Sequence, residues 1–201
     1  EVSIINYSST DEKYSKIEKN YNGKTNFPKM INKICEFELR TEIIIKKTLE
    51  LFNEGNRNIL ILSDRRSHLD YMSIKLSKFN LSCGFYVGGV KPELLREAQT
   101  KDIILGTFSM ASEGMDIPKL NTIILSSPKS DIVQSVGRIL RQKEEHRITH
   151  PHIIDINDNI PIFNNQYKKR LSNYSKNNYD ITILNLDGTK EKYIKKKKKK
   201  E

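Results

Sequence analysis

The sequence predicts a single doubly wound α/β domain with a mostly parallel sheet. Short, almost continuous apolar runs of strand length alternate with amphipathic stretches of helical length. This alternation is typical of parallel strands that are covered by helices on both faces. The length of 201 residues suits one ordinary domain. In such a domain, ligands bind to loops at the carboxyl ends of the strands.

The first elements can be placed from the amino terminus onward. Residues 1–27 open with the apolar run 2–5 and then become polar, so we expect a linker or an edge segment. Apolar residues at helical spacing predict one helix after Pro28 and a second helix, capped by Thr41, that ends near residue 53. Glu1 stands where a complete chain has Met, which suggests a segment of a longer protein.

Strands and helices then alternate to the end of the domain. The predicted strands cover residues 58–62, 84–88, 103–107, 122–125, 152–156 and 181–186. The predicted helices are one capped by Ser67 with Leu69, Met72, Leu76 and Phe79 facing inward, and those at residues 93–99, 131–142 and 167–174. We expect residues 28–186 to form the domain and residues 187–201 to be a basic, disordered tail.

Composition limits the classes of function. The net charge is +10, of which the lysine run 195–200 supplies six charges and the rest of the chain +4, so a polyanionic partner is plausible. The longest apolar run has four residues, far fewer than the roughly 20 that a membrane-spanning helix needs, so we expect no membrane partner. Cys35 and Cys83 form no C-x-x-C pair, which favours neither a zinc site nor a disulfide framework and fits an intracellular compartment.

One short segment partly resembles a nucleotide-binding loop. The segment Gly23-Lys24-Thr25 resembles the end of a P-loop, but Glu18 stands where the motif needs its first glycine. The loop should also lead directly into a helix, whereas Asn26, Phe27 and Pro28 follow it here. We therefore expect this chain to contain no triphosphate cradle of its own.

Three other segments fall at or after the carboxyl ends of predicted strands. They are residues 63–66, residues 107–118 and the helical residues 134–141. Taken singly, each has an ordinary structural explanation as a turn, a loop exit or a solvated helix face. Their combination, in this order, is more specific.

Together these segments resemble the second RecA-like lobe, or helicase C-terminal domain, of superfamily 2 helicases and translocases. The resemblance covers about residues 40–160. Residues 107–118 look like motif V with its E-G-x-D-x-P ending, residues 134–141 match motif VI, Q-x-x-G-R-x-x-R, and residues 59–65 stand where the loosely defined motif IV belongs. The amino-acid sequence of residues 110–118 is similar to that of the corresponding segment in helicases from phages and large DNA viruses.

The resemblance implies roles in hydrolysis of a nucleoside triphosphate. Guanidinium groups suit the charge that spreads over a transferring phosphoryl group. Arg141 is implied to be the arginine finger, Arg138 its neighbour at the γ-phosphate, and Gln134 a ligand of the attacking water or the phosphate. Gly114 would allow the backbone to approach the nucleotide, and Asp116 would accept hydrogen bonds from the ribose.

The resemblance also implies a nucleic-acid strand and a second lobe as partners. Thr107 would contact a backbone phosphate of DNA or RNA, single-stranded or duplex, and Ser63, Arg65 and Gly89 are weaker candidates for the same contact. ATP with Mg²⁺ would be bound mainly by an N-terminal lobe of the same polypeptide, which carries the P-loop. This chain alone is therefore expected to be inactive. The cytoplasm, the nucleus, a viral factory or a virion would all suit such a protein.

Two alternatives remain. A nucleic-acid-binding α/β module without ATPase activity would have no use for Gln134, Arg138 and Arg141 together. A small-molecule enzyme of doubly wound fold would need a G-x-G-x-x-G fingerprint or a nucleophile–base pair, which the sequence lacks. The histidines at 146, 150 and 152 are expected to belong to a surface loop and not to a metal site, because no acidic or cysteine ligand lies at a fitting spacing.

Overall fold

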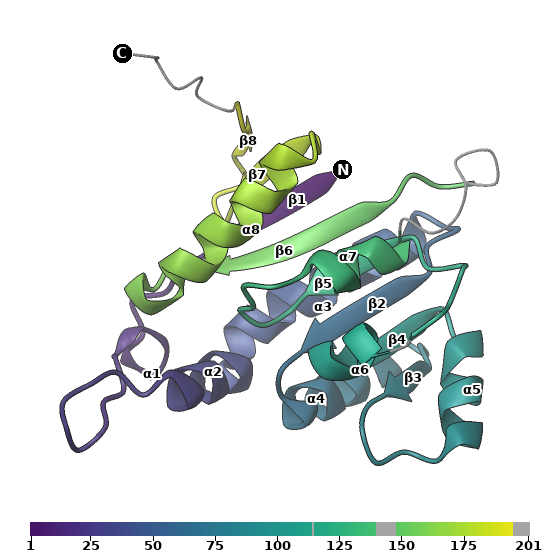
Figure 1. The fold of residues 1–201 in the computed structure, drawn as a ribbon, viewed down its shortest axis with the longest axis horizontal. Helices are drawn as coiled ribbons and strands as arrows, with labels where there is room; N and C mark the ends of the chain where they lie inside the picture. Colours follow the sequence, from purple (N-terminus) through teal and green to yellow (C-terminus); the bar gives the residue numbers. More distant parts are fainter. Residues whose placement is uncertain (114, 140–147, 195–201) are drawn as a thin grey trace.

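The computed structural model describes residues 1–113, 115–139 and 148–194, and these form one eight-stranded sheet (Figure 1). The strand order is β3-β4-β2-β5-β6-β1-β7-β8, and every neighbouring pair is parallel except β7 and β8. The strands are β1 Val2–Tyr7, β2 Ile59–Ser63, β3 Cys83–Tyr86, β4 Ile103–Thr107, β5 Thr122–Leu125, β6 His152–Asp158, β7 Ile181–Asn185 and β8 Lys190–Lys192. The predicted doubly wound, mostly parallel α/β fold is confirmed.

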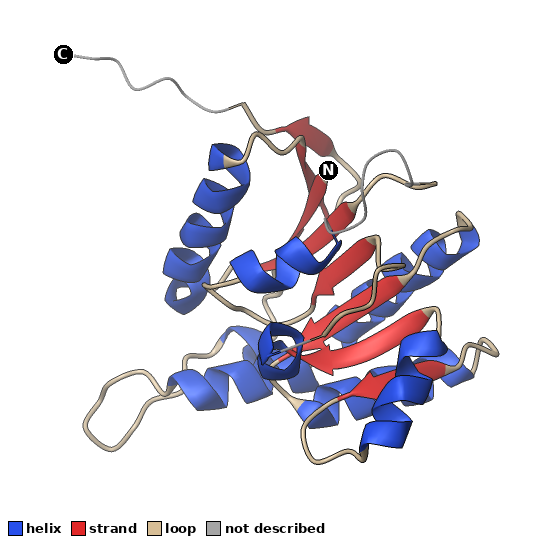
Figure 2. Ribbon diagram, turned by 45° about the vertical axis from the view of Figure 1, so that its right-hand side comes forward, coloured by secondary structure: helices blue, strands red, loops and turns tan. Residues whose placement is uncertain are grey.

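Helices cover both faces of this sheet (Figure 2). They are α1 Glu12–Ser15, α2 Phe27–Glu36, α3 Glu38–Asn53, α4 Arg66–Ser77, α5 Pro92–Thr100, α6 Phe108–Glu113, α7 Val133–Ile139 and α8 Asn164–Lys176, with a 3₁₀ turn η2 at Pro161–Phe163. In Figure 1, α6, α7 and α8 lie in front of the sheet, and α3 and α4 lie behind it.

Two hydrophobic cores result from the alternation of side chains along the strands. In β2, Ile59 and Ile61 pack with α2, α3 and α4, whereas Leu60 and Leu62 pack with α6, α7 and α8 on the opposite face. All five residues of β2 are buried, which explains why the strand appears in the sequence as a continuous apolar run.

The position of β1 corrects the expectation of a linker or edge segment. β1 pairs with β6 on one side and with β7 on the other, so it is an interior strand. Its side chains explain this position, because Val2 and Ile4 enter one core while Ile5 and Tyr7 enter the other. A strand with apolar groups on both faces is suited to the interior of the sheet.

The sheet edge is formed instead by the segment that follows β7. Asp187 and Gly188 turn the chain, with the Asp187 carboxylate accepting from the Thr189 backbone N–H at 2.9 Å. The exposed strand β8 then pairs antiparallel with β7, so the expected disordered tail does not begin at residue 187. The lysine run 195–200 lies outside the described residues.

Two predicted helix caps are also corrected. α3 begins at Glu38, so Thr41 lies inside it, is buried and bonds to the carbonyl of Phe37. α4 begins at Arg66, so Ser67 is already helical. Leu69, Met72 and Leu76 are buried as predicted, but Phe79 lies beyond the end of α4 and is 55% exposed.

Within the described ranges, no helix is long and apolar enough to cross a bilayer.

Candidate functional site

The carboxyl edge of the sheet, where the parallel strands end, brings together residues from three predicted loops. β2 pairs with β4 so that Ser63 lies opposite Thr107. β3 pairs with the other side of β4, and the loop after β3 carries Gly89. The predicted strand-binding positions thus lie along one edge although they come from distant parts of the sequence, with Arg65 two residues after Ser63.

Thr107 and Gly89 are both accessible at this edge. Thr107 is half-buried, and its hydroxyl lies 3.3 Å from Ser109 Oγ. Directly after Thr107 the chain enters α6, which is fixed to the core by the buried Phe108 and Ala111. Gly89 is exposed, has a φ of +77° that favours glycine, and has no neighbour within 4 Å of the position of a Cβ atom.

Ser63, by contrast, is fully buried and contributes to the support of the edge. Its Oγ accepts from the Arg65 backbone N–H at 3.1 Å and lies 3.2 Å from His68 Nδ1. The other ring nitrogen of His68 lies 3.1 Å from the Thr41 hydroxyl. Burial, with a smaller effect of Arg40, lowers the pKa of His68 to about 3, so the imidazole is neutral near pH 7. A hydroxyl in this position does not reach a strand at the surface, which corrects the sequence-based expectation for Ser63.

Arg65 connects the end of β2 to α2. Its Nε donates to Asn32 Oδ1, and its Nη2 donates to the carbonyl oxygen of Pro28 at 3.2 Å. Its Nη1 donates to the carbonyl oxygen of Asp64 at 3.1 Å. These three bonds fix the guanidinium group beside the carboxyl edge and give it a positioning role there.

The loop after β5 contributes residues that the sequence interpretation missed. Ser127 Oγ accepts from the Asp64 backbone N–H at 2.9 Å, and the Ser126 hydroxyl donates to the Leu62 carbonyl at 2.7 Å. Lys129 Nζ lies 3.1 Å from an Asp64 carboxylate oxygen and is 38% exposed, so it brings a cation to the same edge. The signal was available, because these polar residues directly follow a fully buried parallel strand.

The elements of motifs V and VI lie on one face of the sheet. α6 contacts α7, and both pack over the core that contains Leu60 and Leu62. In α7, Ser135 and Val136 are buried while Gln134 is exposed. Asp116 is exposed in the segment between α6 and β5.

Part of the predicted nucleotide site cannot be placed. Arg138 lies in α7, one helical turn after Gln134, but its side chain is not described. Gly114 and Arg141 lie outside the described residues. The structure therefore brings Thr107, Asp116 and Gln134 onto neighbouring elements and leaves the guanidinium groups as predictions.

The segment that resembles a P-loop lies in a hairpin. Lys19 and Thr25 pair as an antiparallel bridge, so Gly23 and Lys24 belong to a hairpin and not to a loop at the end of a sheet strand. α2 does begin at Phe27, closer to this loop than expected, but the Asn26 side chain caps it by accepting from the Lys29 backbone N–H.

The described residues contain no group of three or more His, Cys, Asp or Glu side chains that could hold a metal ion. His152 begins β6, in agreement with the predicted strand at residues 152–156 and not with a surface loop, and its Nε2 lies 2.9 Å from Ser3 Oγ. Burial and nearby positive charges, Arg57 first among them, lower the pKa of His152 to about 3. His146 lies outside the described residues.

This fold, with motif V and motif VI segments on adjacent elements, defines a helicase-type RecA-like lobe. The chain belongs to the helicase conserved C-terminal domain family, whose model matches residues 41–143 and so includes both motifs. The resemblance to the second lobe of superfamily 2 helicases is thereby confirmed.

Relatives that match most of this chain include viral proteins. A protein of Acanthamoeba polyphaga mimivirus named as an ATP-dependent RNA helicase, L396, is 40% identical over 197 residues, covering 93% of this chain and 37% of its own length. The similarly named QP509L of African swine fever virus is 24% identical over 179 residues, covering 80% of this chain and 35% of its own length. The crystal structure of T4 UvsW matches with a TM-score of 0.68 at 20% identity, over 92% of this chain and 41% of that one. The chain thus spans well under half of these relatives.

Proposed function

We propose that this chain is the C-terminal lobe of an ATP-dependent helicase or translocase that moves along a nucleic-acid strand. The observation that carries the proposal is the arrangement of motif V and motif VI. The motif V segment begins at the accessible Thr107 on the carboxyl edge, and its helix α6 contacts α7, which displays Gln134. A change at the nucleotide can in this way be passed to the strand through two helices in direct contact.

In this proposal the carboxyl edge holds the strand through its phosphates. Thr107 offers a hydroxyl, and the exposed backbone at Gly89 allows a phosphate to approach closely. Ser63 and Arg65 support the edge from beneath and from the side. Contacts of this kind position a strand without reading its sequence, as a translocase requires. The names of the mimivirus and African swine fever virus relatives favour RNA over DNA as the strand.

ATP would be held between this lobe and an N-terminal lobe of the same polypeptide. The residues of this chain fit a supporting role, because an exposed amide at Gln134 and the guanidinium groups expected at Arg138 and Arg141 suit phosphate oxygens. Gly114 and Asp116 would face the nucleoside. The hairpin that contains Gly23 and Lys24 does not present the helix N-terminus of a P-loop, so the triphosphate cradle and Mg²⁺ are assigned to the other lobe.

Two substitutions separate the roles of the two motifs in the polypeptide that includes the N-terminal lobe. Arg141→Ala should lower the turnover number for ATP by roughly 10³- to 10⁵-fold, because an arginine finger stabilises transition-state charge. Its affinity for the strand should be nearly unchanged. Thr107→Ala should keep most of the basal ATPase activity but lose stimulation by the strand and strand displacement. Steady-state ATPase assays with and without a strand, together with strand-binding titrations, measure both effects.

Arg141→Lys is the matched control, because it keeps the charge but not the planar fork that grips two phosphate oxygens. We expect it to remain close to the alanine variant. If folded Arg141→Ala protein hydrolyses ATP like the wild type, the arginine-finger role is wrong and a nucleic-acid-binding module without ATPase activity becomes the better account.

A further inference from the structure

The segment between β1 and α3 holds a concentration of positive charge. Residues 13–33 contain six lysines and one glutamate, a net charge of +5. Residues 1–194 as a whole also carry +5, with 29 Lys and Arg against 24 Asp and Glu. Asp11, Glu12 and Glu36 directly flank residues 13–33, so the net charge of the whole connection between β1 and α3, residues 8–37, is +2.

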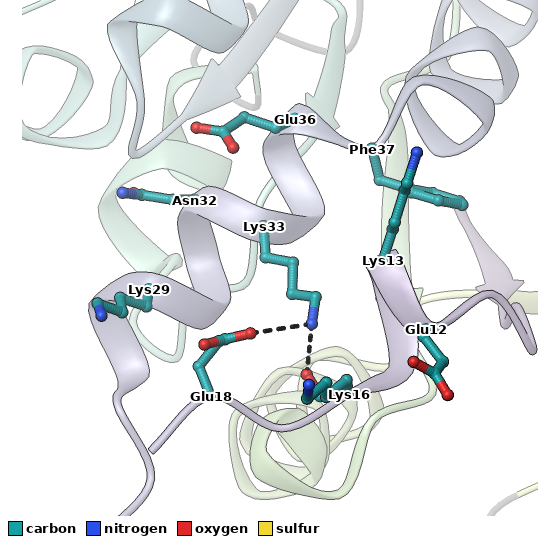
Figure 3. Close-up of a pocket in the computed structure, with 9 residues that line it drawn as sticks. All are labelled: Glu12, Lys13, Lys16, Glu18, Lys29, Asn32, Lys33, Glu36 and Phe37. Atoms are coloured by element: carbon teal, nitrogen blue, oxygen red, sulfur yellow. Dashed lines mark hydrogen bonds and ion pairs between the residues drawn. The ribbon is translucent and has the colours of Figure 1, made fainter. Parts of the chain in front are cut away.

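Most of these lysines are available to a ligand. Lys13, Lys16, Lys19, Lys24 and Lys29 are exposed, and none of them forms an ion pair with a described residue. The sixth lysine, Lys33, forms an ion pair within the segment (Figure 3). Its Nζ lies 3.2 Å from Glu18 Oε1 and 2.6 Å from the carbonyl oxygen of Lys16. The only acidic side chain of residues 13–33 is therefore already neutralised.

These lysines border a hollow. A cavity of about 680 Å³ lies between α1 and α2, and its lining includes Lys13, Lys16 and Lys29. Figure 3 shows Lys13 and Lys29 on opposite sides of this hollow, with Lys33 between them. Glu12 and Glu36 line the same hollow, so a phosphate backbone that enters here would meet the three exposed lysines and also two carboxylates.

The hairpin at residues 19–25 adds an aromatic group to this surface. Asn20 and Gly23 close its turn, with the Gly23 N–H donating to the Asn20 carbonyl at 2.9 Å and the Asn20 N–H donating to the Lys24 carbonyl at 2.8 Å. Tyr21 stands at the tip and is fully exposed, at 114% of the reference area. Figure 1 shows this loop projecting from the body between α1 and α2. An aromatic ring that a hydrogen-bonded turn holds in solvent is suited to stack on a planar ligand.

The segment is mounted firmly on the carboxyl edge. Tyr14 of α1 is buried and donates to Asp158 Oδ1 at 2.9 Å, at the end of β6. Phe27, at the start of α2, packs edge-to-face on Phe163 with ring centroids 5.6 Å apart. The Pro28 carbonyl accepts from Arg65, so the base of the hairpin lies one hydrogen bond from the end of β2.

We propose that the hairpin at residues 19–25 and the exposed lysines of α1 and α2 form a second contact for single-stranded nucleic acid, continuous with the carboxyl edge. Tyr21 stacks on an unpaired base, and the lysines bind the adjacent phosphates. An aromatic platform beside a basic groove is how single strands are held without sequence preference. A duplex offers no free base face, so the occupant is a single strand. The inference rests on the proposed function, which places a nucleic-acid strand on the neighbouring carboxyl edge.

The chain contains no tryptophan, which provides a direct test. In a Tyr21→Trp variant of the 201-residue chain, a 20-nucleotide oligo(U) or oligo(dT) strand should quench tryptophan fluorescence on binding, because the indole stacks on a base. Phe79→Trp, which puts the same probe on an exposed aromatic position just beyond the end of α4, should not respond. Using both strands shows whether RNA or DNA is preferred.

Affinity gives a second measurement. Tyr21→Ala should weaken binding by roughly 5- to 150-fold, the range that follows from removing one base–aromatic stack. Tyr21→Phe should bind within about twofold of the wild type, because the ring remains. Phe79→Ala should have no effect.

The lysine contribution is tested by salt. Lys19→Gln with Lys24→Gln should reduce the slope of log Kd against log salt by about 1.4, since each single-strand phosphate contact contributes about 0.7. Lys46→Gln with Lys78→Gln, which removes two exposed lysines on the α3–α4 side, is the control and should leave the slope unchanged.

The outcomes separate this inference from the proposed function. If Thr107→Ala weakens strand binding while Tyr21→Trp stays unquenched and Tyr21→Ala binds normally, the second contact is wrong and the proposed function stands. If strand binding is independent of both Thr107 and Tyr21, or absent, both are overturned. Quenching together with the loss of affinity in Tyr21→Ala supports the proposal.

Discussion

At the scale of single residues, the carboxyl edge is supported by a buried chain of hydrogen bonds. Thr41 donates to the Phe37 carbonyl, which leaves its oxygen to accept from His68 Nε2. His68 Nδ1 can then accept from Ser63, whose oxygen receives the Arg65 backbone N–H. This assignment satisfies each partner only if His68 is neutral, in agreement with its lowered pKa of about 3.

Acid should therefore destabilise the domain through His68. In the unfolded chain a histidine has a pKa near 6.5, so between pH 6.5 and 3 the unfolded state binds a proton that the folded state excludes. Stability is full above pH 6.5 and falls as the pH drops. From pH 7.5 to 5.5, His68 should account for a loss of about 1.4 kcal/mol in the free energy of unfolding.

Urea denaturation across this pH range measures the effect. His68→Gln should be less stable at pH 7.5 but should show a smaller loss on acidification than the wild type. His150→Gln removes an exposed histidine and serves as the control. An unchanged pH dependence in His68→Gln would show that its imidazole does not carry the acid sensitivity.

At the scale of secondary-structure elements, the sequence predicts strands better than helix starts. The bounds of β4 and β5 agree with the prediction residue for residue, because a buried parallel strand is a continuous apolar run. The starts of α3 and α4 were misplaced because a threonine and a serine resembled N-caps, whereas neither helix has a side-chain cap. The residues that precede these helices, Phe37 and Arg65, are held by tertiary contacts that local propensity does not record.

The packing of α5 on β3 depends on a glycine whose role the sequence did not reveal. A Cβ atom at Gly84 would lie 2.5 Å from Ala98 Cα and 2.5 Å from the Ala98 carbonyl oxygen. Because backbone atoms cannot yield as a flexible side chain does, Gly84→Ala should force β3 and α5 apart. We expect a loss of about 1–3 kcal/mol in the free energy of unfolding, the usual result of overpacking.

Gly137→Ala is the matched control, since it makes the same change in a helix where a Cβ atom would meet nothing within 4 Å. It should be neutral or stabilise the domain by up to about 1 kcal/mol. Chemical denaturation of both variants measures the difference. Equal stability of the two would contradict the close packing of β3 on α5.

At the scale of the whole molecule, the fold class and the family could be predicted from the sequence, but the order of strands could not. The interior place of β1 arises from pairing with β6 and β7, which lie about 150 and 180 residues further along the chain. No local pattern encodes such pairings. The candidate site divides in the same way: Thr107 and Gly89 lie at the predicted edge, whereas the burial of Ser63 depends on the tertiary structure.

The basic segment at residues 13–33 could not be predicted for a related reason. Its lysines are spread through a sequence that looks like an ordinary polar linker. They become one surface only because Tyr14 and Phe27 fix α1 and α2 to the ends of the sheet strands.

The central claim is that this lobe completes an ATPase but does not contain one. The most direct test is the ATP turnover of the 201-residue chain, measured alone and joined to the proposed N-terminal P-loop lobe, with a single strand present. The account predicts that the chain alone stays at the background set by its Arg141→Ala variant, and that the joined protein turns over ATP in a strand-stimulated reaction. Turnover by the chain alone that disappears in the Arg141→Ala variant would contradict the account.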